Sequence, residues 1–199
     1  TPKPRVLVVG ASFAGLHAQR KLAATTDLTL LDFKDYFEYT PGVLRCYVQP
    51  RHLRAIAKPL PRRRNRLVVA ELVELRDDAA TVRTADGAMR ELGYDYLLLA
   101  TGTRYPCEPV SATPAETDLA ARQRRWERAA DELDAASSVL VLGGGPVGVE
   151  LATELAAARP GKRLTLATSG GLLCSALPRR VGEACRAWLE SHGVELRFH

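Results

Sequence analysis

The sequence predicts an α/β protein with two Rossmann-like units and a small antiparallel β-meander between them. One short apolar run, followed by glycines and a helical pattern, occurs twice, at residues 5–10 and 138–143. Such runs are typical of strands that are buried on both faces of a parallel sheet. Strand-like segments with turn residues separate the two copies. A hydrophobic content of 46% and a charged content of 26% agree with a globular protein.

In the first unit, residues 5–9 are predicted to form a strand. Ala14, Ala18 and Leu22 then recur on one helix face, and residues 28–31 form the next strand. This order of strand, glycines, helix and strand is that of a β-α-β unit.

The middle of the sequence has a different pattern. Residues 66–75 and 79–83 are predicted strands around an Asp-Asp turn, and a second turn precedes residues 89–92. Residues 94–100 form another apolar strand. Residues 115–136 are predicted to form a charged, mostly exposed helix.

The second unit begins at residues 138–142, and its first helix carries Val147, Leu151 and Leu155 on one face. Residues 164–167, 178–192 and 194–198 are then read as strand, helix and strand. Three strands are half of a doubly wound fold. The sequence is therefore interpreted as a fragment, truncated C-terminally.

The first glycine motif differs from G-x-G-x-x-G at Ser12, which replaces the second glycine. Gly10 permits the tight turn and Gly15 permits close helix–strand packing. The helix N-terminus favours a phosphate group. Asp32 follows at the end of the next strand, where an acid can hold a ribose hydroxyl. The predicted dinucleotide contacts are Gly10, Ser12, Phe13, Ala14, Gly15 and Asp32; the alternative is an ordinary strand–helix turn.

The second motif matches the full pattern and predicts a second dinucleotide site at Gly143, Gly145, Pro146 and Gly148. Pro146 suits the first helical turn. The next strand ends in Thr168 and Ser169 where an acid would hold a ribose, so NADH and NADPH both stay open. Glu150 and Glu154 lie one turn apart on the helix and are either dipole-stabilising acids or a group beside the cofactor.

The charge pattern allows an alternative function, and the cysteine pattern bears on metal binding. The net charge is +5, with basic clusters at 58–66 and at 122–128. Both are interpreted as solvated surfaces, although a basic patch also suits nucleic acid or a membrane. The alternative function is thus a nucleotide-binding redox sensor or interaction module without turnover. A flavin monooxygenase is a third option. The four cysteines have no zinc spacing and no C-x-x-C motif.

Four segments in order resemble the pyridine nucleotide-disulfide oxidoreductase superfamily, in its branch of type II NADH dehydrogenases and apoptosis-inducing-factor-like or ferroptosis-suppressor-like quinone reductases. They are the first motif with its acid, residues 35–41, residues 94–102 (Y-D-x-L-x-x-A-T-G) and residues 143–154. The resemblance covers nearly the whole chain. It implies an FAD-binding domain at 1–110, a linker helix at 111–136 and an incomplete NAD(P)H-binding domain at 137–199.

The resemblance also implies residue roles. Leu72 would contact the adenine through its backbone, and Lys34 would lie near the flavin or its ribose. Glu150 would be the catalytic residue at the flavin–nicotinamide junction. The further FAD contacts implied by the A-T-G motif are Ala100, Thr101 and Gly102.

The implied reaction passes electrons from NAD(P)H through FAD to a quinone or another small acceptor. A dithiol partner for Cys46 is missing, which favours such an acceptor over a redox-active disulfide. A glycine–aspartate motif and an interface domain are expected beyond residue 199, so the fragment alone is expected to hold FAD weakly and to be inactive. A homodimer and peripheral membrane association are further expectations, whereas nucleic-acid binding is not expected. No signal peptide or transmembrane segment is recognised, and the expected compartment is cytoplasmic or mitochondrial.

Overall fold

The computed structural model describes residues 2–60, 66–105 and 107–199. The chain forms two compact units. The N-terminal unit comprises Thr1–Thr40 and Leu53–Arg125, and the C-terminal unit comprises Pro41–His52 and Trp126–His199. Residues 41–52 thus belong to the C-terminal unit. The division into an FAD-binding domain at 1–110, a linker helix at 111–136 and an NAD(P)H-binding domain at 137–199 stays a prediction.

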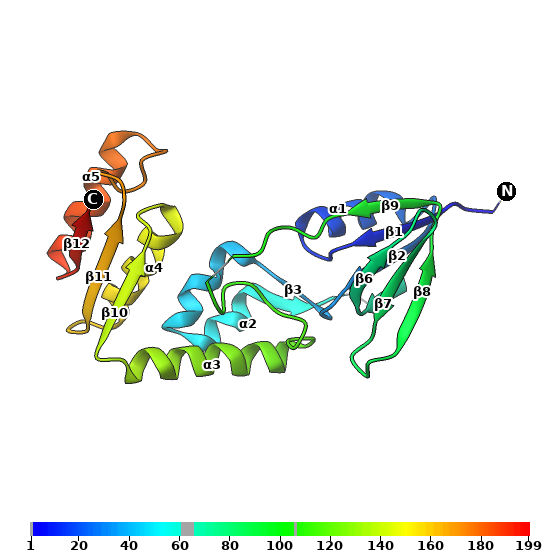
Figure 1. Ribbon diagram of the computed structural model, residues 1–199, viewed down its shortest axis with the longest axis horizontal. Helices are drawn as coiled ribbons and strands as arrows, with labels where there is room; N and C mark the ends of the chain where they lie inside the picture. Colours follow the sequence, from blue (N-terminus) through cyan, green and yellow to red (C-terminus); the bar gives the residue numbers. More distant parts are fainter. Residues whose placement is uncertain (1, 61–65, 106) are drawn as a thin grey trace. The chain divides into compact units, whose positions relative to one another are not determined.

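A four-stranded parallel sheet forms the centre of the N-terminal unit (Figure 1). Its order is β5 (Arg66–Val69), β2 (Asp27–Asp32), β1 (Arg5–Val9) and β9 (Tyr96–Leu99), and α1 (Phe13–Leu22) connects β1 to β2. All three strand pairings are parallel. The predicted β-α-β unit is confirmed.

The continuous apolar run of β1 reflects burial on both faces of this sheet. Val6 and Val8 pack in a cluster that includes Leu16 and Leu22 of α1. Leu7 and Val9 pack instead in a cluster that includes Ala80, Val82 and Leu92 of the antiparallel meander. Because successive strand side chains point to opposite faces, a strand between two covering layers must be apolar at every position.

The meander consists of β6 (Glu71–Leu75), β7 (Ala79–Arg83) and β8 (Met89–Gly93). The prediction of one strand over 66–75 is wrong. The chain changes sheets at Ala70, whose N–H donates to the carbonyl of Asp32 at 2.9 Å. Strand propensity is continuous through this stretch, and pairing with β2 decides which part joins the parallel sheet.

Shorter elements connect these layers. β3 (Tyr36–Glu38) and β4 (Ala57–Pro59) form an antiparallel pair, and between them lie two 3₁₀ helices and one helical turn. These elements are η1 (Thr40–Tyr47), η2 (Pro50–His52) and α2 (Leu53–Ile56).

The helix α3 (Leu119–Ala135) is present close to the predicted bounds, but it is not mostly exposed. Its buried side chains are Arg122, Trp126, Ala129, Ala130 and Leu133. They recur at helical spacing and form an inward face. Arg122 is fully buried, which contradicts its interpretation as part of a solvated basic cluster. Charge alone does not predict exposure when partners are available inside.

The C-terminal unit repeats the β-α-β pattern, as predicted. The parallel strands β10 (Ser138–Leu142), β11 (Arg163–Thr168) and β12 (Glu195–Phe198) lie in that order, with α4 (Pro146–Ala158) and α5 (Arg179–Ser191) as connections. Val141 and Leu166 join a core that includes residues of both helices. Leu142 is 76% exposed, so the prediction that this strand is buried on both faces is wrong for β10. Among the residues described, no helix combines the length and apolar character needed to cross a bilayer.

Candidate functional site

The first glycine motif forms a tight turn at the carboxyl end of β1. Gly10 has φ +104°, a conformation that favours glycine, and its N–H donates to the carbonyl of Leu31 at 2.7 Å. A Cβ on Gly10 would lie 2.2 Å from the Ala100 carbonyl oxygen, and one on Gly15 would lie 1.7 Å from the Gly10 oxygen. Both positions therefore exclude any side chain, as the motif predicts.

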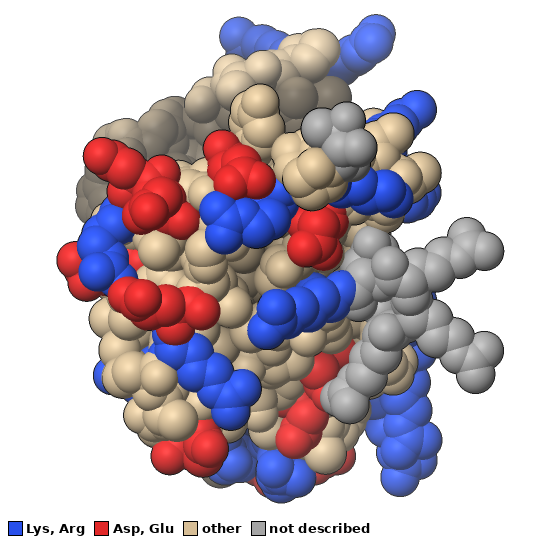
Figure 2. All heavy atoms as spheres, turned by 90° about the vertical axis from the view of Figure 1, so that its right-hand side faces the viewer, with Lys and Arg blue, Asp and Glu red and all other residues tan. Residues whose placement is uncertain are grey.

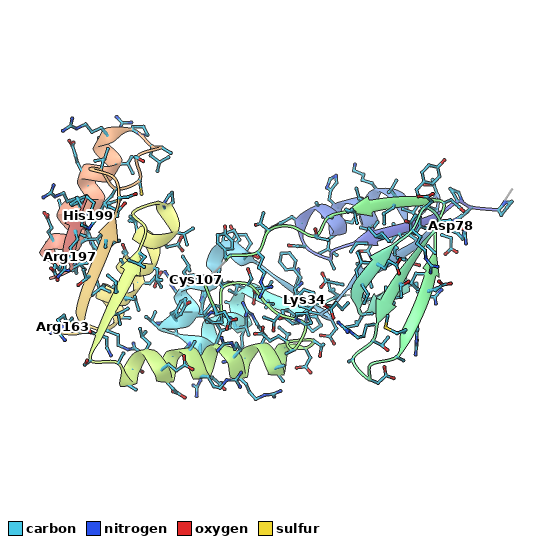
Figure 3. All side chains as sticks on the ribbon, viewed as in Figure 1. Lys34, Asp78, Cys107, Arg163, Arg197 and His199 are labelled. Atoms are coloured by element: carbon cyan, nitrogen blue, oxygen red, sulfur yellow. The ribbon has the colours of Figure 1, made fainter. Side chains whose placement is uncertain are left out.

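Asp32 is the buried acid at the end of β2, 8% exposed. Its Oδ2 accepts a hydrogen bond from the Ala11 N–H at 2.7 Å, and its Oδ1 accepts one from the Lys34 N–H at 3.2 Å. The Lys34 Nζ lies 3.4 Å from Oδ2. The carboxylate thus fixes the glycine loop, and the Lys34 ammonium lies beside it, near the start of β3 (Figure 3).

The N-terminus of α1 is accessible. Phe13 and Ala14 are exposed, and Ser12 at the N-cap makes no side-chain capping bond. The Phe13 ring packs edge-on against Phe37 and Tyr39, with centroids 5.4 and 5.8 Å apart. The opening N–H groups of a helix attract an anion, so this geometry suits a phosphate group.

The A-T-G motif lies at the carboxyl end of β9, beside the Gly10 turn, and Leu72 lies in the meander. The Ala100 N–H donates to the Val9 carbonyl at 2.8 Å, which places Ala100 against Gly10. Thr101 and Gly102 follow and are exposed. Leu72 is half-buried in β6. A hollow of about 210 Å³ lies beside its neighbours Ala70 and Glu71, without Leu72 itself in the lining.

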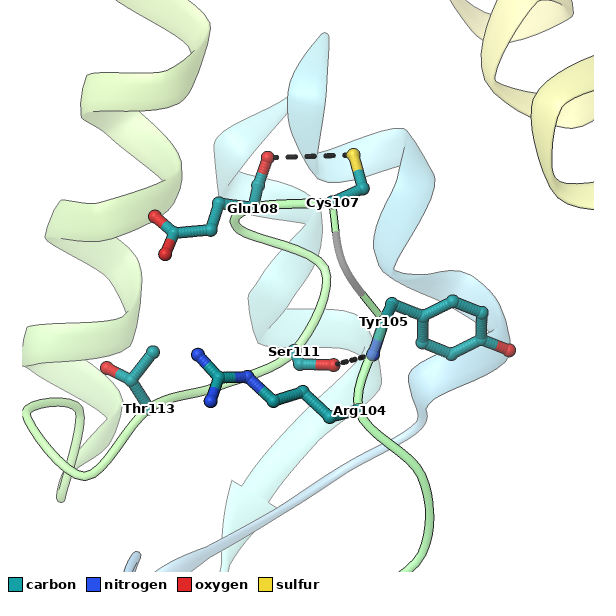
Figure 4. Close-up of a pocket in the computed structure, with 6 residues that line it drawn as sticks. All are labelled: Arg104, Tyr105, Cys107, Glu108, Ser111 and Thr113. Atoms are coloured by element: carbon teal, nitrogen blue, oxygen red, sulfur yellow. Dashed lines mark hydrogen bonds between the residues drawn. The ribbon is translucent and has the colours of Figure 1, made fainter. Parts of the chain in front are cut away.

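A second hollow of about 330 Å³ follows the A-T-G motif and is lined by Arg104, Tyr105, Cys107, Glu108, Ser111 and Thr113 (Figure 4). The Ser111 Oγ accepts a hydrogen bond from the Tyr105 N–H at 2.9 Å. None of these residues was predicted to be functional. They lie in an irregular segment where neither periodicity nor a motif indicates a site.

The second glycine motif repeats the geometry of the first. Gly143 has φ +111° and donates its N–H to the Ala167 carbonyl at 2.8 Å. A Cβ on Gly148 would lie 2.0 Å from the Gly143 oxygen. Gly145 caps α4, a Cβ there would meet open space, and Pro146 occupies the first helical turn.

The two motifs differ in their acid. The strand β11 ends in Thr168, whose Oγ1 accepts a hydrogen bond from the Gly170 N–H at 3.4 Å. Asp32 instead places a carboxylate at the corresponding end of β2. A carboxylate there would repel a 2′-phosphate, and a hydroxyl would not. The choice of nicotinamide nucleotide therefore stays open.

Glu150 and Glu154 lie on α4, beyond the glycine motif. Arg45 of η1 donates to Glu154, with its Nη2 2.9 Å from Oε1 and its Nε 3.0 Å from the same oxygen. Glu150 is exposed. Partial desolvation, followed by the negative charge of Glu154, raises the pKa of Glu150, whereas Arg45 lowers it. Glu150 therefore keeps its proton to a higher pH than an ordinary glutamate does.

Both motifs fit a dinucleotide. Each combines a turn where a Cβ would clash, a helix N-terminus and adjacent strand ends. In α/β sheets, ligands bind at the carboxyl ends of the strands. Among the described residues no metal-ligand cluster occurs.

The basic clusters do not form a continuous cationic surface in the described residues. Arg62, Arg63 and Arg64 lie outside the described residues. Arg122 is buried and Arg125 pairs with Glu108. Figure 2 shows acidic and basic side chains interspersed over one face. These observations do not favour a nucleic-acid interface.

The sequence matches a known protein family over almost its whole length. The family described as pyridine nucleotide-disulphide oxidoreductase matches residues 4–199. Apoptosis-inducing factor homolog B of Dictyostelium discoideum is 26% identical over 86% of this chain and 45% of its own length. Ferroptosis suppressor protein 1 of Xenopus tropicalis is 29% identical over 96% of this chain and 51% of its own length. The chain spans about half the length of the curated relatives it matches.

Solved structures share the fold. NDH2 of Plasmodium falciparum in complex with NADH has a TM-score of 0.76 and 16% identity, over 98% of this chain and 48% of that one. Reduced CoADR-RHD of Bacillus anthracis has a TM-score of 0.79 and 18% identity, over 100% of this chain and 38% of that one. The α/β fold with Rossmann-like units is confirmed.

Proposed function

The chain belongs to the pyridine nucleotide-disulphide oxidoreductase family, and from this premise we propose that it binds FAD at the Gly10 motif and NAD(P)H at the Gly143 motif. The protein that carries it would pass electrons from NAD(P)H through the flavin to a small acceptor. The duplicated glycine motif carries this proposal. In each copy the first glycine donates its N–H to the next strand, and the helix glycine packs against the carbonyl oxygen of that first glycine. Of the two motifs, only the first is followed by a buried acid, Asp32, at the end of the next strand.

A quinone is the proposed acceptor. A redox-active disulfide at η1 would need two cysteines, and residues 40–47 contain only Cys46, which is buried. Without a dithiol in this segment, electrons would leave the flavin directly to a diffusible acceptor. The compartment, a dimer and membrane association stay predictions.

The residues of the N-terminal unit would bind and orient the flavin nucleotide. The exposed first turn of α1, with Ser12, Phe13 and Ala14, would receive the pyrophosphate, and Asp32 would hold a ribose hydroxyl. Lys34 would contribute a positive charge beside that ribose. The flavin nucleotide would also contact Ala100, Thr101 and Gly102, which follow β9. Its adenine would contact the backbone of Leu72. The flavin, when bound, supplies the acceptance and release of electrons.

The residues of the C-terminal unit would bind the nicotinamide nucleotide. Gly143, Gly145 and Gly148 keep the backbone close to the pyrophosphate, and Pro146 starts the helix that faces it. Glu150 would hold a proton at its carboxyl group and deliver it as the acceptor is reduced. Its raised pKa supports that role, because a general acid must stay protonated near the working pH.

Asp32→Ala should weaken FAD binding by roughly 10- to 150-fold, the equivalent of about 1.5–3 kcal/mol for a hydrogen bond to a charged group. The loss combines the ribose contact with the bond that fixes the Ala11 N–H. Flavin fluorescence titration of the full protein measures it. Asp27→Asn, at the opposite end of β2, is the control. Equal affinity of the Asp32 variant and the control would remove the assigned role.

Glu150→Gln should lower turnover about a hundredfold and leave FAD bound. The raised pKa of Glu150 means that its proton is lost only at higher pH, so wild-type activity should fall as pH rises through that pKa. The variant should lack this fall. Because the folded-state pKa is raised, the folded protein loses stability as pH rises through it, and the glutamine removes this loss.

Steady-state rates measured across pH test the loss of activity, and thermal unfolding across pH tests the loss of stability. Glu154→Gln should keep the fall in activity but move it to lower pH, since the charge of Glu154 raises the pKa of Glu150. A Glu150→Gln variant with the wild-type pH profile would contradict the proton-donor role.

The acceptor is tested by following NAD(P)H oxidation in the full flavoprotein. A water-soluble quinone should support turnover well above the rate with dissolved oxygen alone. Equal rates with and without quinone would overturn the proposed acceptor, although not the two nucleotide sites.

A further inference from the structure

Two cysteines of the C-terminal unit come together beside the second glycine motif. Cys174 follows β11, and Cys185 lies on α5. Cys185 packs against the core cluster that contains Cys174. Burial, followed by the neighbouring Cys185, raises the pKa of the Cys174 thiol. Both are reduced in the structure.

Helix packing explains why they meet. Gly182 of α5 is so close to the loop after β11 that a Cβ there would lie 2.2 Å from the Leu173 carbonyl oxygen. Cys185 is three positions further on, on the same face of the helix. Cys174 follows Leu173 directly. The absence of a side chain at Gly182 thus lets α5 pack closely against the loop, so that Cys185 lies near Cys174.

The loop that carries Cys174 also supports the glycine motif. The Cys174 N–H donates to the Gly144 carbonyl at 2.7 Å, and the Leu173 side chain would meet a Cβ on Gly144 at 2.9 Å. Cys174 itself has φ +49°, which is uncommon for a residue with a side chain. The surrounding packing holds this conformation, so a new covalent bond at Cys174 would be transmitted to Gly144.

We propose that Cys174 and Cys185 are an oxidative modification site, at which a peroxide converts the two thiols into a disulfide that weakens nucleotide binding at the Gly143 motif. The proposed disulfide rests on the shared core packing of Cys174 and Cys185 and on the close approach of Gly182 to Leu173. Its effect on affinity rests on the proposed function of that motif.

The chemistry proceeds in two steps. Cys185 is half-buried and accessible, whereas Cys174 is 4% exposed, so peroxide reaches Cys185 first. The Cys185 thiolate attacks one peroxide oxygen; an S–O bond forms, the O–O bond breaks, and water leaves after protonation. The Cys174 sulfur then attacks the sulfenic sulfur, an S–S bond forms, and the S–O oxygen leaves as a second water. Two thiols lose two electrons in total, and one peroxide gains them.

Hydrogen peroxide treatment of the chain, followed by alkylation and peptide mass mapping, tests the pair. The Cys174–Cys185 cross-link should form and revert with a dithiol reductant. Cys185→Ser should abolish it, and Cys107→Ser, at an exposed cysteine outside the pair, should not. Free Cys174 and Cys185 in a sample whose exposed Cys107 has been oxidised would overturn the proposal.

The effect on binding is measured by titrating NADH and NADPH against the reduced and the oxidised protein. We expect at least a tenfold rise in Kd on oxidation, with no change in the peroxide-treated Cys185→Ser variant. An unchanged Kd in a sample with a mapped disulfide would overturn the effect on affinity. If the reduced protein binds neither nucleotide, the proposed function fails, while the mass map still decides the disulfide.

Discussion

Replacing Gly148 with alanine should weaken NAD(P)H binding at least tenfold and leave FAD in place. The added Cβ would lie 2.0 Å from the Gly143 carbonyl oxygen, a separation that no packed structure tolerates. That oxygen belongs to the turn itself, so α4 must move away from β10 and the phosphate cradle opens. We expect at least a tenfold loss of affinity, equivalent to about 1.4 kcal/mol or more. Isothermal titration with NADH and NADPH measures it.

The reciprocal change separates the two sites. Gly15→Ala, whose Cβ would lie 1.7 Å from the Gly10 oxygen, should remove FAD and spare NAD(P)H binding. Gly171→Ala is the matched control, because a Cβ there meets nothing within 4 Å. Loss of both nucleotides in each variant would show that the glycines act only through overall stability. Normal binding in Gly148→Ala would exclude the Gly143 motif as a site.

Replacing Arg122 with methionine should destabilise the N-terminal unit by about 3–5 kcal/mol, the usual consequence of removing one partner of a buried ion pair. The fully buried guanidinium donates to Glu38 at 2.7 and 3.0 Å and to Glu116 at 3.0 Å. It also donates to two backbone carbonyls, those of Pro109 and Val110, at 2.7 and 3.1 Å. Methionine keeps the stem of the side chain but leaves two buried carboxylates without their cation.

Urea unfolding measures this loss. Arg124→Met is the control, because Arg124 is exposed on the same helix. Adding Glu38→Gln and Glu116→Gln to the Arg122 variant should recover part of the stability, since the uncompensated charges are then removed. Equal unfolding midpoints for the Arg122 and Arg124 variants would contradict the structural role of this cluster.

The duplicated β-α-β units could be predicted from the sequence because their signals are local. An apolar run, a glycine turn and a helical period each depend on a few neighbouring residues. The close approach of Gly15 to Gly10 and of Gly148 to Gly143 follows from the same short motif. The position of Asp32 at the end of its strand was predictable for the same reason.

The features that escaped prediction depend on contacts between distant segments. The break at Ala70 is decided by pairing with β2, because the strand propensity of residues 66–75 is continuous. Arg122 belongs to a charged helical stretch, and its partner Glu38 is far away in the sequence. Cys174 and Cys185 meet only because Gly182 lets α5 approach the preceding loop.

Anaerobic addition of NADH or NADPH to the full flavin-loaded protein tests the central claim most directly. The account predicts that the visible absorbance of the bound flavin bleaches with one of the two nucleotides. It also predicts that Gly148→Ala, with the same flavin content, stays yellow at nucleotide concentrations that bleach the wild type. A protein that takes up no flavin, or a flavin that neither nucleotide reduces, would contradict the account.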